Sequence, residues 1–288
     1  MCRLFGQLSL EPRAAVDLLV DSEFSLLEQS RAKKTCLQKD GWGLAWYEGG
    51  KPVVRKSAEP IYKEEAKLRT WAAEAVSKIV IGHVRAASNP LKLPKERLIN
   101  ERNNQPFADG VWTFAHNGTI NIPNEAAAAL GPWKKRLKGE NDSEIYFMHL
   151  RKHLEKAGSF HEAAQNTLSE LWDIWDGCKK DHPGVTAPYT SVNVIASDGE
   201  SLYGLCHSAY KGMATYGACH PGQPWQLMSF GERAGRVVMA SEGFDSGEWK
   251  TFAPPETMRA FVKGGRVVVE RSPLGKDLHQ TPLEVSVP

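Results

Sequence analysis

The sequence lacks any apolar run that approaches the roughly 18–20 residues of a membrane-spanning helix. No signal peptide is recognised ahead of Cys2. The five cysteines are odd in number and include no C-x-x-C pair, and the nine histidines show no metal-ligand spacing. This usage argues against a disulfide framework and against a zinc site. We therefore expect a cytoplasmic protein without a metal or other cofactor, whose cysteines are Cys2, Cys36, Cys178, Cys206 and Cys219.

The sequence also lacks an excess of charge of either sign. Lys and Arg together number 36 and Asp and Glu 34, which gives a net charge of +2. That balance gives no reason to expect nucleic acid as a partner. There is no internal repeat, low-complexity segment or convincing linker, and hydrophobic residues make up an ordinary 41% of the 288 residues. A chain of this length is expected to bury a substantial core.

Hydrophobic periodicity predicts strands at both ends of the chain and helices in the middle. This order indicates one α+β domain in which two sheets pack face to face with helices outside. The expected strands cover residues 2–10, 40–47, 78–88, 111–119, 191–197, 201–207, 237–242 and 266–269. The expected helices cover residues 12–29, 61–78, 145–156 and 160–175.

Cys2 directly follows the initiator methionine. A residue this small at position 2 favours removal of Met1, and Cys2 would then carry both a thiol and a free α-amine. The thiolate is the attacking form of cysteine. An α-amine titrates near ~7.7–8.0 and can take the thiol proton close to neutral pH. The alternative is a small apolar residue buried at the start of a strand.

Two further segments place polar groups at the ends of apolar strands. Residues 78–88 end in Arg85 and Ser88, and burying such a charge is costly unless an anion pairs with it. The planar fork of arginine suits a carboxylate. Residues 111–119 break at Asn117-Gly118, which is either a hairpin turn or an oxyanion-binding device. His116 is more typical of a structural residue than of a catalytic one.

The helix start at Asn141-Asp142 and the glycines around Trp42 can each be interpreted as structural or as functional features. Asn141 or Asp142 is the expected N-cap of the following helix. The glycines on either side of Trp42 would let another part of the chain approach this strand closely. Trp42 and Trp46 are otherwise typical of core-filling side chains.

Four of these pieces, in this order and spacing, resemble the glutaminase domain of class II glutamine amidotransferases, which are N-terminal nucleophile hydrolases. The pieces are Cys2, His83-Val84-Arg85, the segment from Phe114 to Thr119, and the segment from Asn141 to Glu144. The resemblance covers residues 2 to about 245 and includes Ala240-Ser241-Glu242. It implies a four-layer αββα sandwich of two mainly antiparallel sheets. It also implies an amidotransferase domain over residues 2–250, completed by strands within 251–288.

The resemblance also implies roles for individual residues. Cys2 would attack the amide carbonyl of glutamine or of a γ-glutamyl compound and form a thioester. Asn117, through its side-chain amide, and Gly118, through its N–H, would stabilise the oxyanion. The α-carboxylate of the substrate would bind Arg85 and, less directly, Ser88. Its α-ammonium would bind Asp142.

The sequence departs from the family pattern at two points. Ala86 stands where the family often has an aromatic residue, which could widen the pocket. Residues 243–288 are too few for a separate synthase domain of typical size, so the chain resembles the stand-alone branch. Three functions stay open: a hydrolase of γ-glutamyl amides, a glutaminase subunit that delivers ammonia to a separate synthase, and a non-catalytic γ-glutamyl-binding protein. The expected partner is a small molecule, with a separate synthase or a second copy of the chain as further candidates.

Overall fold

The structure is a computed structural model that describes residues 2–32, 37–211, 227–233, 235–275 and 281–282. Met1, Cys36 and Cys219 lie outside these ranges. The predicted removal of Met1 therefore concerns a residue that the structure does not describe. The described cysteines Cys2, Cys178 and Cys206 all carry free thiols.

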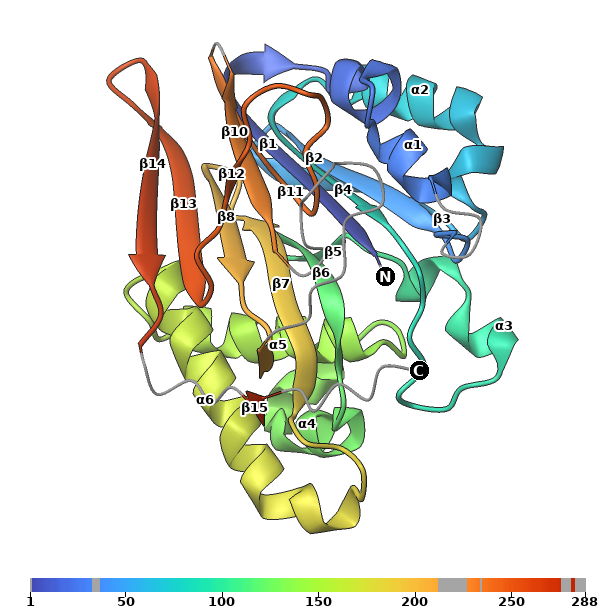
Figure 1. The fold of residues 1–288 in the computed structure, drawn as a ribbon, viewed down its shortest axis with the longest axis vertical. Coiled ribbons are helices and arrows are strands. Elements are labelled where there is room, and N and C mark those ends of the chain that lie inside the picture. The colour runs from blue at the N-terminus through green and yellow to red at the C-terminus, as the bar shows by residue number, and fades with distance from the viewer. Residues whose placement is uncertain (1, 33–36, 212–226, 234, 276–280, 283–288) are drawn as a thin grey trace.

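Two antiparallel sheets are stacked face to face and form the centre of the molecule (Figure 1). The first has the order β12-β10-β11-β1-β4-β2-β3, and the second has the order β14-β13-β8-β7-β6-β5. The strands of the first sheet are β1 (Arg3–Arg13), β2 (Trp42–Glu48), β3 (Lys51–Ser57), β4 (Ser77–Val84), β10 (Ser229–Arg233), β11 (Arg236–Ala240) and β12 (Lys250–Thr251). The strands of the second are β5 (Phe107–Asp109), β6 (Trp112–Ile120), β7 (Tyr189–Ser197), β8 (Ser201–Cys206), β13 (Glu256–Lys263) and β14 (Arg266–Pro273).

Alternation along β1 divides its side chains between two cores, because successive residues of a strand point to opposite faces. Leu4 and Leu8 are buried between the two sheets, and a Cβ at Gly6 would lie 2.6 Å from a methyl group of Ile195 in β7. Phe5 points the other way, into the core beneath the helices of the first sheet. The period-2 pattern of this segment therefore correctly predicted a strand, and the structure shows that both faces of this strand are buried.

Helices cover the outer face of each sheet and complete the four layers (Figure 1). The first sheet is covered by a π-helix, η1 (Asp17–Asp21), with α1 (Leu26–Arg31), η3 (Ile61–Lys63) and α2 (Glu65–Glu74). The second is covered by α4 (Pro123–Ala129), α5 (Asp142–Leu154) and α6 (Phe160–Cys178). Short turns complete the set: α3 (Lys95–Leu98), η4 (Glu101–Asn103), η5 (Gly131–Arg136) and η6 (Lys179–Asp181). The αββα architecture of stacked antiparallel sheets is confirmed.

The prediction of one helix over residues 12–29 is wrong. Strand β1 continues to Arg13, which pairs with Ser77 at the start of β4. The helical part is split, because Ser22 is extended after η1 and Ser25 caps α1 by accepting the Glu28 N–H at 3.2 Å. The predicted helix over residues 61–78 is likewise shorter, since Ser77 already belongs to β4. In both places strand pairing extends into sequence that has helical periodicity.

The strands after residue 250 pair with strands from earlier in the chain. Strand β12 adds to β10, and β13 pairs with β8 from Glu256↔Cys206 to Phe261↔Ser201. Outside the two large sheets, β9 (Tyr210–Lys211) pairs with β15 (Thr281–Pro282). Among the described residues, no helix has the length and apolar character needed to cross a membrane.

Candidate active site

Cys2 lies one residue before β1, at the end of the central strand of the first sheet. Its side chain is only 8% exposed, and its Sγ donates to the Ala86 carbonyl oxygen at 3.5 Å. Burial raises the pKa of the thiol, while the Ala86 hydrogen bond and the charge of Arg85 oppose that rise. The thiol is therefore protonated at neutral pH, and attack requires a proton acceptor beside it. The α-amine that Met1 removal would create is such an acceptor.

Arg85 follows β4 directly, and its side chain is buried. Its main chain continues the pairing with the segment before β2, because its N–H donates to the Gly41 carbonyl at 2.8 Å. Its Nη1 donates to the Leu98 carbonyl at 2.9 Å and to Asn104 Oδ1 at 3.0 Å. Burial lowers the pKa of Arg85 below its ordinary value, and the nearby Cys2 and Asp142 oppose the change. One nitrogen of the guanidinium is thus fixed, while Nε and Nη2 bond to no other described residue and can face a ligand.

Asp142 is the first residue of α5 and is buried. It is not the N-cap, because the side chain of Asn141 accepts the Ser143 N–H at 2.7 Å and fills that role. Asp142 Oδ2 instead accepts the N–H of Ile120, at the end of β6, at 2.9 Å. Burial raises the pKa of Asp142 to about 6, against the opposing effects of the Ile120 N–H and Arg85. The structure thus resolves the choice that the sequence left between two capping residues.

Strand β6 runs through Asn117 and Gly118 without turning, so the hairpin interpretation of this pair is wrong. Asn117 pairs with Asn193 and Gly118 with Val192, and the register shifts between Gly118 and Ile120. A Cβ at position 118 would lie 1.8 Å from the Ser191 carbonyl oxygen, so only glycine fits there. The carbonyl of Asn117 accepts from Ser191 Oγ at 3.0 Å, whereas its buried side-chain amide bonds to no other described residue. That amide can therefore donate to a substrate.

Arg85, Ser88 and Asp142, the three predicted substrate-binding residues, line one small pocket together with Leu98 and Asn141. A cationic and an anionic side chain in one pocket match the two charges of an amino acid. Cys2, Asn117 and Gly118 do not line it, but the charges of Arg85 and Asp142 both act on the Cys2 thiol. The structure therefore brings the predicted nucleophile and the two predicted charge-binding residues together.

Residues 103–105 form a cluster of buried amides that was not predicted from the sequence. Asn103 accepts the Glu140 N–H at 2.7 Å and accepts from Asn141 Nδ2 at 2.7 Å through its carbonyl, which fixes the start of α5. Asn104 holds Arg85 and donates to the Ser57 carbonyl at 2.6 Å. Gln105 bonds to both the N–H and the carbonyl of His116, the residue before Asn117. Residues 103–105 thus hold the start of α5, the guanidinium of Arg85 and the main chain of His116 in place.

The glycines around Trp42 were the available signal for this cluster. A Cβ at Gly41 would lie 2.0 Å from Asn104 Nδ2, and one at Gly43 would lie 2.5 Å from the Gln105 carbonyl oxygen. The close approach that these glycines suggested is therefore real, and residues 104–105 are what approaches. Trp42 and Trp46 are both buried in the core under the helices, and for Trp46 this core-filling role was predicted.

His116 is a structural link. Its Nε2 contacts the Ser191 carbonyl at 3.1 Å and its Nδ1 contacts Ser143 Oγ at 2.9 Å, which joins β6 to β7 and α5. Burial lowers its pKa to about 4, so the ring is neutral at neutral pH. Because the carbonyl can only accept, the proton is assigned to Nε2. Within the described ranges, no group of three or more His, Cys, Asp or Glu side chains could hold a metal ion.

Two stacked antiparallel sheets with helices on both outer faces form the fold of N-terminal nucleophile hydrolases, and here the buried Cys2 precedes the central strand of the first sheet. Residues 1–282 match the family described as class II glutamine amidotransferases. The chain belongs to this family.

Curated relatives and solved structures agree with this assignment. The γ-glutamyl-hercynylcysteine sulfoxide hydrolase of Mycobacterium tuberculosis (strain CDC 1551 / Oshkosh) is 26% identical over 250 residues, which cover 85% of this chain and 86% of the relative. A glutamine aminotransferase class-II domain protein from Silicibacter pomeroyi superposes with a TM-score of 0.60 at 19% identity, over 93% of this chain and 98% of that one. Glutamine phosphoribosylpyrophosphate amidotransferase from B. subtilis gives 0.58 at 15% identity, over 98% of this chain and 51% of that one. Both structures share the fold.

We expect Asp142→Asn to weaken binding of an amino acid and to remove its pH dependence between pH 5 and 7.5. With a pKa of about 6, the carboxylate that would hold an ammonium group is about 90% protonated at pH 5. Binding of glutamine to an inactive Cys2→Ala protein should therefore be about 10-fold weaker at pH 5 than at pH 7.5. Calorimetry on Cys2→Ala with and without Asp142→Asn measures both effects. Unchanged affinity in the Asn variant would give Asp142 a structural role only.

Asp142→Asn also tests how the buried carboxyl group affects the stability of the folded protein. The folded pKa of about 6 lies above the ordinary value of 3.8, so this group stabilises the folded state fully only below its unfolded pKa. That contribution is lost as the pH rises through 6. An asparagine can still accept the Ile120 N–H and has no charge to bury, so the melting temperature of Asp142→Asn at pH 7 should equal or exceed that of the parent. A lower melting temperature would contradict this account.

Proposed function

We propose that this chain hydrolyses a γ-glutamyl amide bond without a synthase partner, through a thioester on Cys2. The observation that carries the proposal is the buried cluster of Cys2, Arg85 and Asp142 beside one small pocket. Arg85 binds the α-carboxylate of the γ-glutamyl group and Asp142 binds its α-ammonium, with Ser88 near the carboxylate. These contacts orient the side-chain carbonyl toward Cys2. Orientation of this kind is a major source of rate enhancement.

The reaction then proceeds in two halves. The Cys2 Sγ attacks the δ-carbon, and the thiol proton passes to the α-amine of Cys2. The oxyanion accepts hydrogen bonds from the Asn117 side-chain amide and the Gly118 N–H. The α-ammonium of Cys2 then returns the proton to the leaving amine as the C–N bond breaks. The product of this half is a thioester between Cys2 and the γ-glutamyl group. Water attacks the thioester with the α-amine again as base, glutamate is released, and the thiol is restored.

Position 86 supports an amide with a substituent larger than ammonia. The Ala86 carbonyl lies 3.5 Å from the Cys2 Sγ, so residue 86 borders the nucleophile. A methyl side chain at this position leaves room that an aromatic residue would fill. The similar mycobacterial protein is named a γ-glutamyl-hercynylcysteine sulfoxide hydrolase, and a γ-glutamyl compound with a bulky amine is the substrate class that we infer here. We place this activity in the cytoplasm, in keeping with the scattered cysteines.

The test compares substrates on the isolated, Met-processed protein. Binding energy from a remote part of a substrate can lower the barrier. We therefore expect kcat/KM to be at least about 10-fold higher for γ-glutamyl peptides with a bulky amine side than for glutamine. Glutamate release, with intact mass to establish that Met1 is absent, is the measurement.

The other two functions give different results in the same assay. A subunit that delivers ammonia needs its partner to complete the site, so negligible rates that rise when a co-purifying protein is added would favour that function. Binding of γ-glutamyl compounds without turnover by Met-processed protein would favour a binding protein.

A further inference from the structure

Few contacts hold the main chain of Cys2. Pairing of β1 with β4 begins at Arg3↔Val84, and pairing with β11 begins at Phe5↔Ala240, so Cys2 lies beyond both ladders. Among the described residues, its thiol contacts the Ala86 carbonyl, and its own carbonyl accepts from Arg3 Nη1 at 3.1 Å. Chain ends generally fray unless something ties them down. The position of this main chain therefore depends on the side chain of the next residue.

The Arg3 guanidinium is itself held from the far end of the sequence. Its Nη2 forms an ion pair with Glu242 Oε1 at 2.8 Å. The side chains are 6% and 0% exposed, so the pair is shielded from water on both sides. A buried pair of this kind is weak evidence for stability, because desolvation of both charges offsets their attraction. Such a pair is more readily explained by a need for fixed geometry.

The residue beside Glu242 holds the same end of the strand. Ser241 Oγ accepts the Leu4 N–H at 3.0 Å, and the Ser241 N–H donates to the Leu4 carbonyl at 3.0 Å. Together with the Arg3–Glu242 pair, residues 241–242 thus act on the main chain of residues 2–4 at three points. The Ala240-Ser241-Glu242 motif, which the reaction itself does not use, acquires a purpose here.

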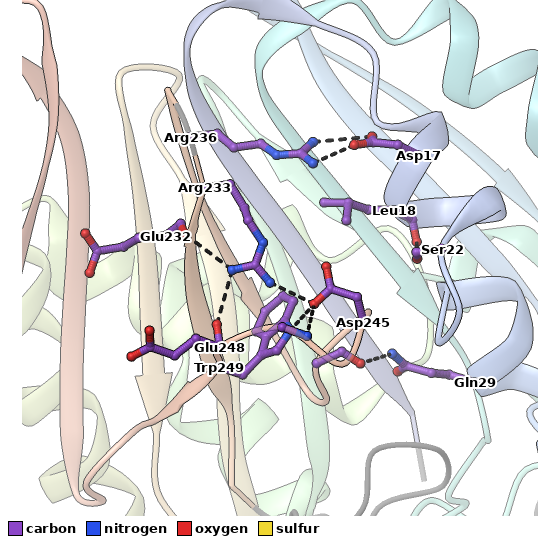
Figure 2. A network of polar contacts seen from close by, with 12 residues as sticks. Asp17, Leu18, Ser22, Gln29, Glu232, Arg233, Arg236, Asp245, Glu248 and Trp249 are labelled. Carbon is purple, nitrogen blue, oxygen red and sulfur yellow. Dashed lines mark hydrogen bonds and ion pairs between the residues drawn. The ribbon is translucent and has the colours of Figure 1, made fainter.

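The segment that carries Glu242 is anchored in turn by a polar network (Figure 2). Asp245 Oδ1 accepts from Arg233 Nη2 at 2.8 Å and from Trp249 Nε1 at 2.9 Å. Gln29, a residue of α1, donates through its Nε2 to the Gly243 carbonyl at 3.4 Å. These contacts fix the loop after β11 to the sheet and to the helices that cover it. Glu242 is therefore a fixed point for Arg3.

We propose that Arg3 is a positioning residue for the nucleophile and that Glu242 anchors it. The inference rests on the proposed function, because it takes Cys2 as the attacking residue. The Arg3 fork bonds the Cys2 carbonyl through one nitrogen and Glu242 through the other, and so it sets where the thiol and the α-amine lie relative to the bound amide. Arg3 touches no part of the pocket lined by Arg85, Ser88 and Asp142. Its loss should thus reduce kcat and leave substrate binding nearly unchanged.

The test replaces the whole pair by apolar residues, Arg3→Met with Glu242→Leu. Apolar replacement of a buried ion pair is often neutral or stabilising, so this variant should melt at or near the temperature of the parent. Its kcat should fall about 10- to 100-fold, since a displacement near 1 Å can cost that much. KM should change by less than about threefold. The matched control is Arg259→Met with Glu270→Leu, an exposed pair across β13 and β14 whose loss should leave kcat unchanged.

A second variant, Arg3→Lys, tests the inference if the double variant does not fold. Arg3→Lys keeps the charge but cannot bond both oxygens with a planar fork, so it should retain a kcat between those of the parent and the apolar double variant. A folded Arg3→Met/Glu242→Leu protein with the parental kcat overturns the inference. If the double variant does not fold, a parental kcat in Arg3→Lys overturns it. Cys2→Ala, assayed in parallel, separates the two proposals: an active Cys2→Ala protein refutes the proposed function itself.

Discussion

Cys2→Ala is expected to lower glutamate release by on the order of 10⁴-fold or more, which is the scale on which enzymes lose activity with their nucleophile. The substitution removes the attacking sulfur but only one heavy atom from a site that is 8% exposed. The fold should be retained, because Cys2 lies outside the strand ladders of β1. Steady-state rates on glutamine and γ-glutamyl peptides, with thermal unfolding of the same samples, measure both parts.

Cys206→Ala and Cys178→Ala are the matched controls. Cys206 is fully buried between the sheets, and its burial raises its pKa to about 12, so it is a poor nucleophile. Cys178 is the last residue of α6 and packs against the core between the helices and the second sheet. Both variants should keep the parental kcat. Full glutamate release by a folded Cys2→Ala protein would exclude Cys2 as the nucleophile.

Asn117→Ala is expected to lower kcat by about 10²–10³-fold, equivalent to about 2.7–4 kcal/mol of transition-state stabilisation. The buried side-chain amide of Asn117 bonds to no other described residue, so its removal breaks no structural hydrogen bond. The main-chain contact from Ser191 Oγ to the Asn117 carbonyl survives the substitution. Because the amide acts on charge that develops during the reaction, KM should change little.

Asn121→Ala is the matched control, since Asn121 lies just beyond the same strand and its Nδ2 donates to the Ala187 carbonyl at 3.0 Å. Its kcat should stay at the parental value. Gly118 cannot be tested in this way, because any Cβ there would collide with the Ser191 carbonyl and disturb the pairing of β6 with β7. If Asn117→Ala raised KM and left kcat unchanged, the amide would bind substrate rather than the oxyanion.

The site combines two costly features that its surroundings offset. A buried guanidinium and a buried carboxylate lie close to the same thiol, and burial shifts the pKa of each toward its neutral form. Asn104 and the Leu98 carbonyl hold the first, and the Ile120 N–H holds the second. Among the described residues, Nε and Nη2 of Arg85 have no hydrogen-bond partner, so they are available to an anionic ligand.

The sequence alone determined the class of the fold and predicted the candidate residues of the site. Cys2, Arg85, Asn117-Gly118 and Asp142 were predicted because their motifs, in this order and spacing, resemble those of class II amidotransferases. Arg85 and Asp142 also stand at a strand end and a helix start, which local pattern marks. The period-2 alternation of residues 2–10 predicted a strand, and β1 is found there. Alternation along a strand is a local feature, so it can be detected without knowledge of the partner strands.

Tertiary structure alone decided which interpretation of an ambiguous residue holds. Asn117-Gly118 is typical of a hairpin, and only pairing with β7, more than 70 residues away, keeps β6 straight. The extension of β1 to Arg13 depends in the same way on its partner Ser77. The roles of Asn103, Asn104 and Gln105 and the Arg3–Glu242 pair depend on contacts between segments distant in sequence. No local pattern encodes such contacts, because a side chain's hydrogen-bond partner is fixed only when the sheets and helices have packed.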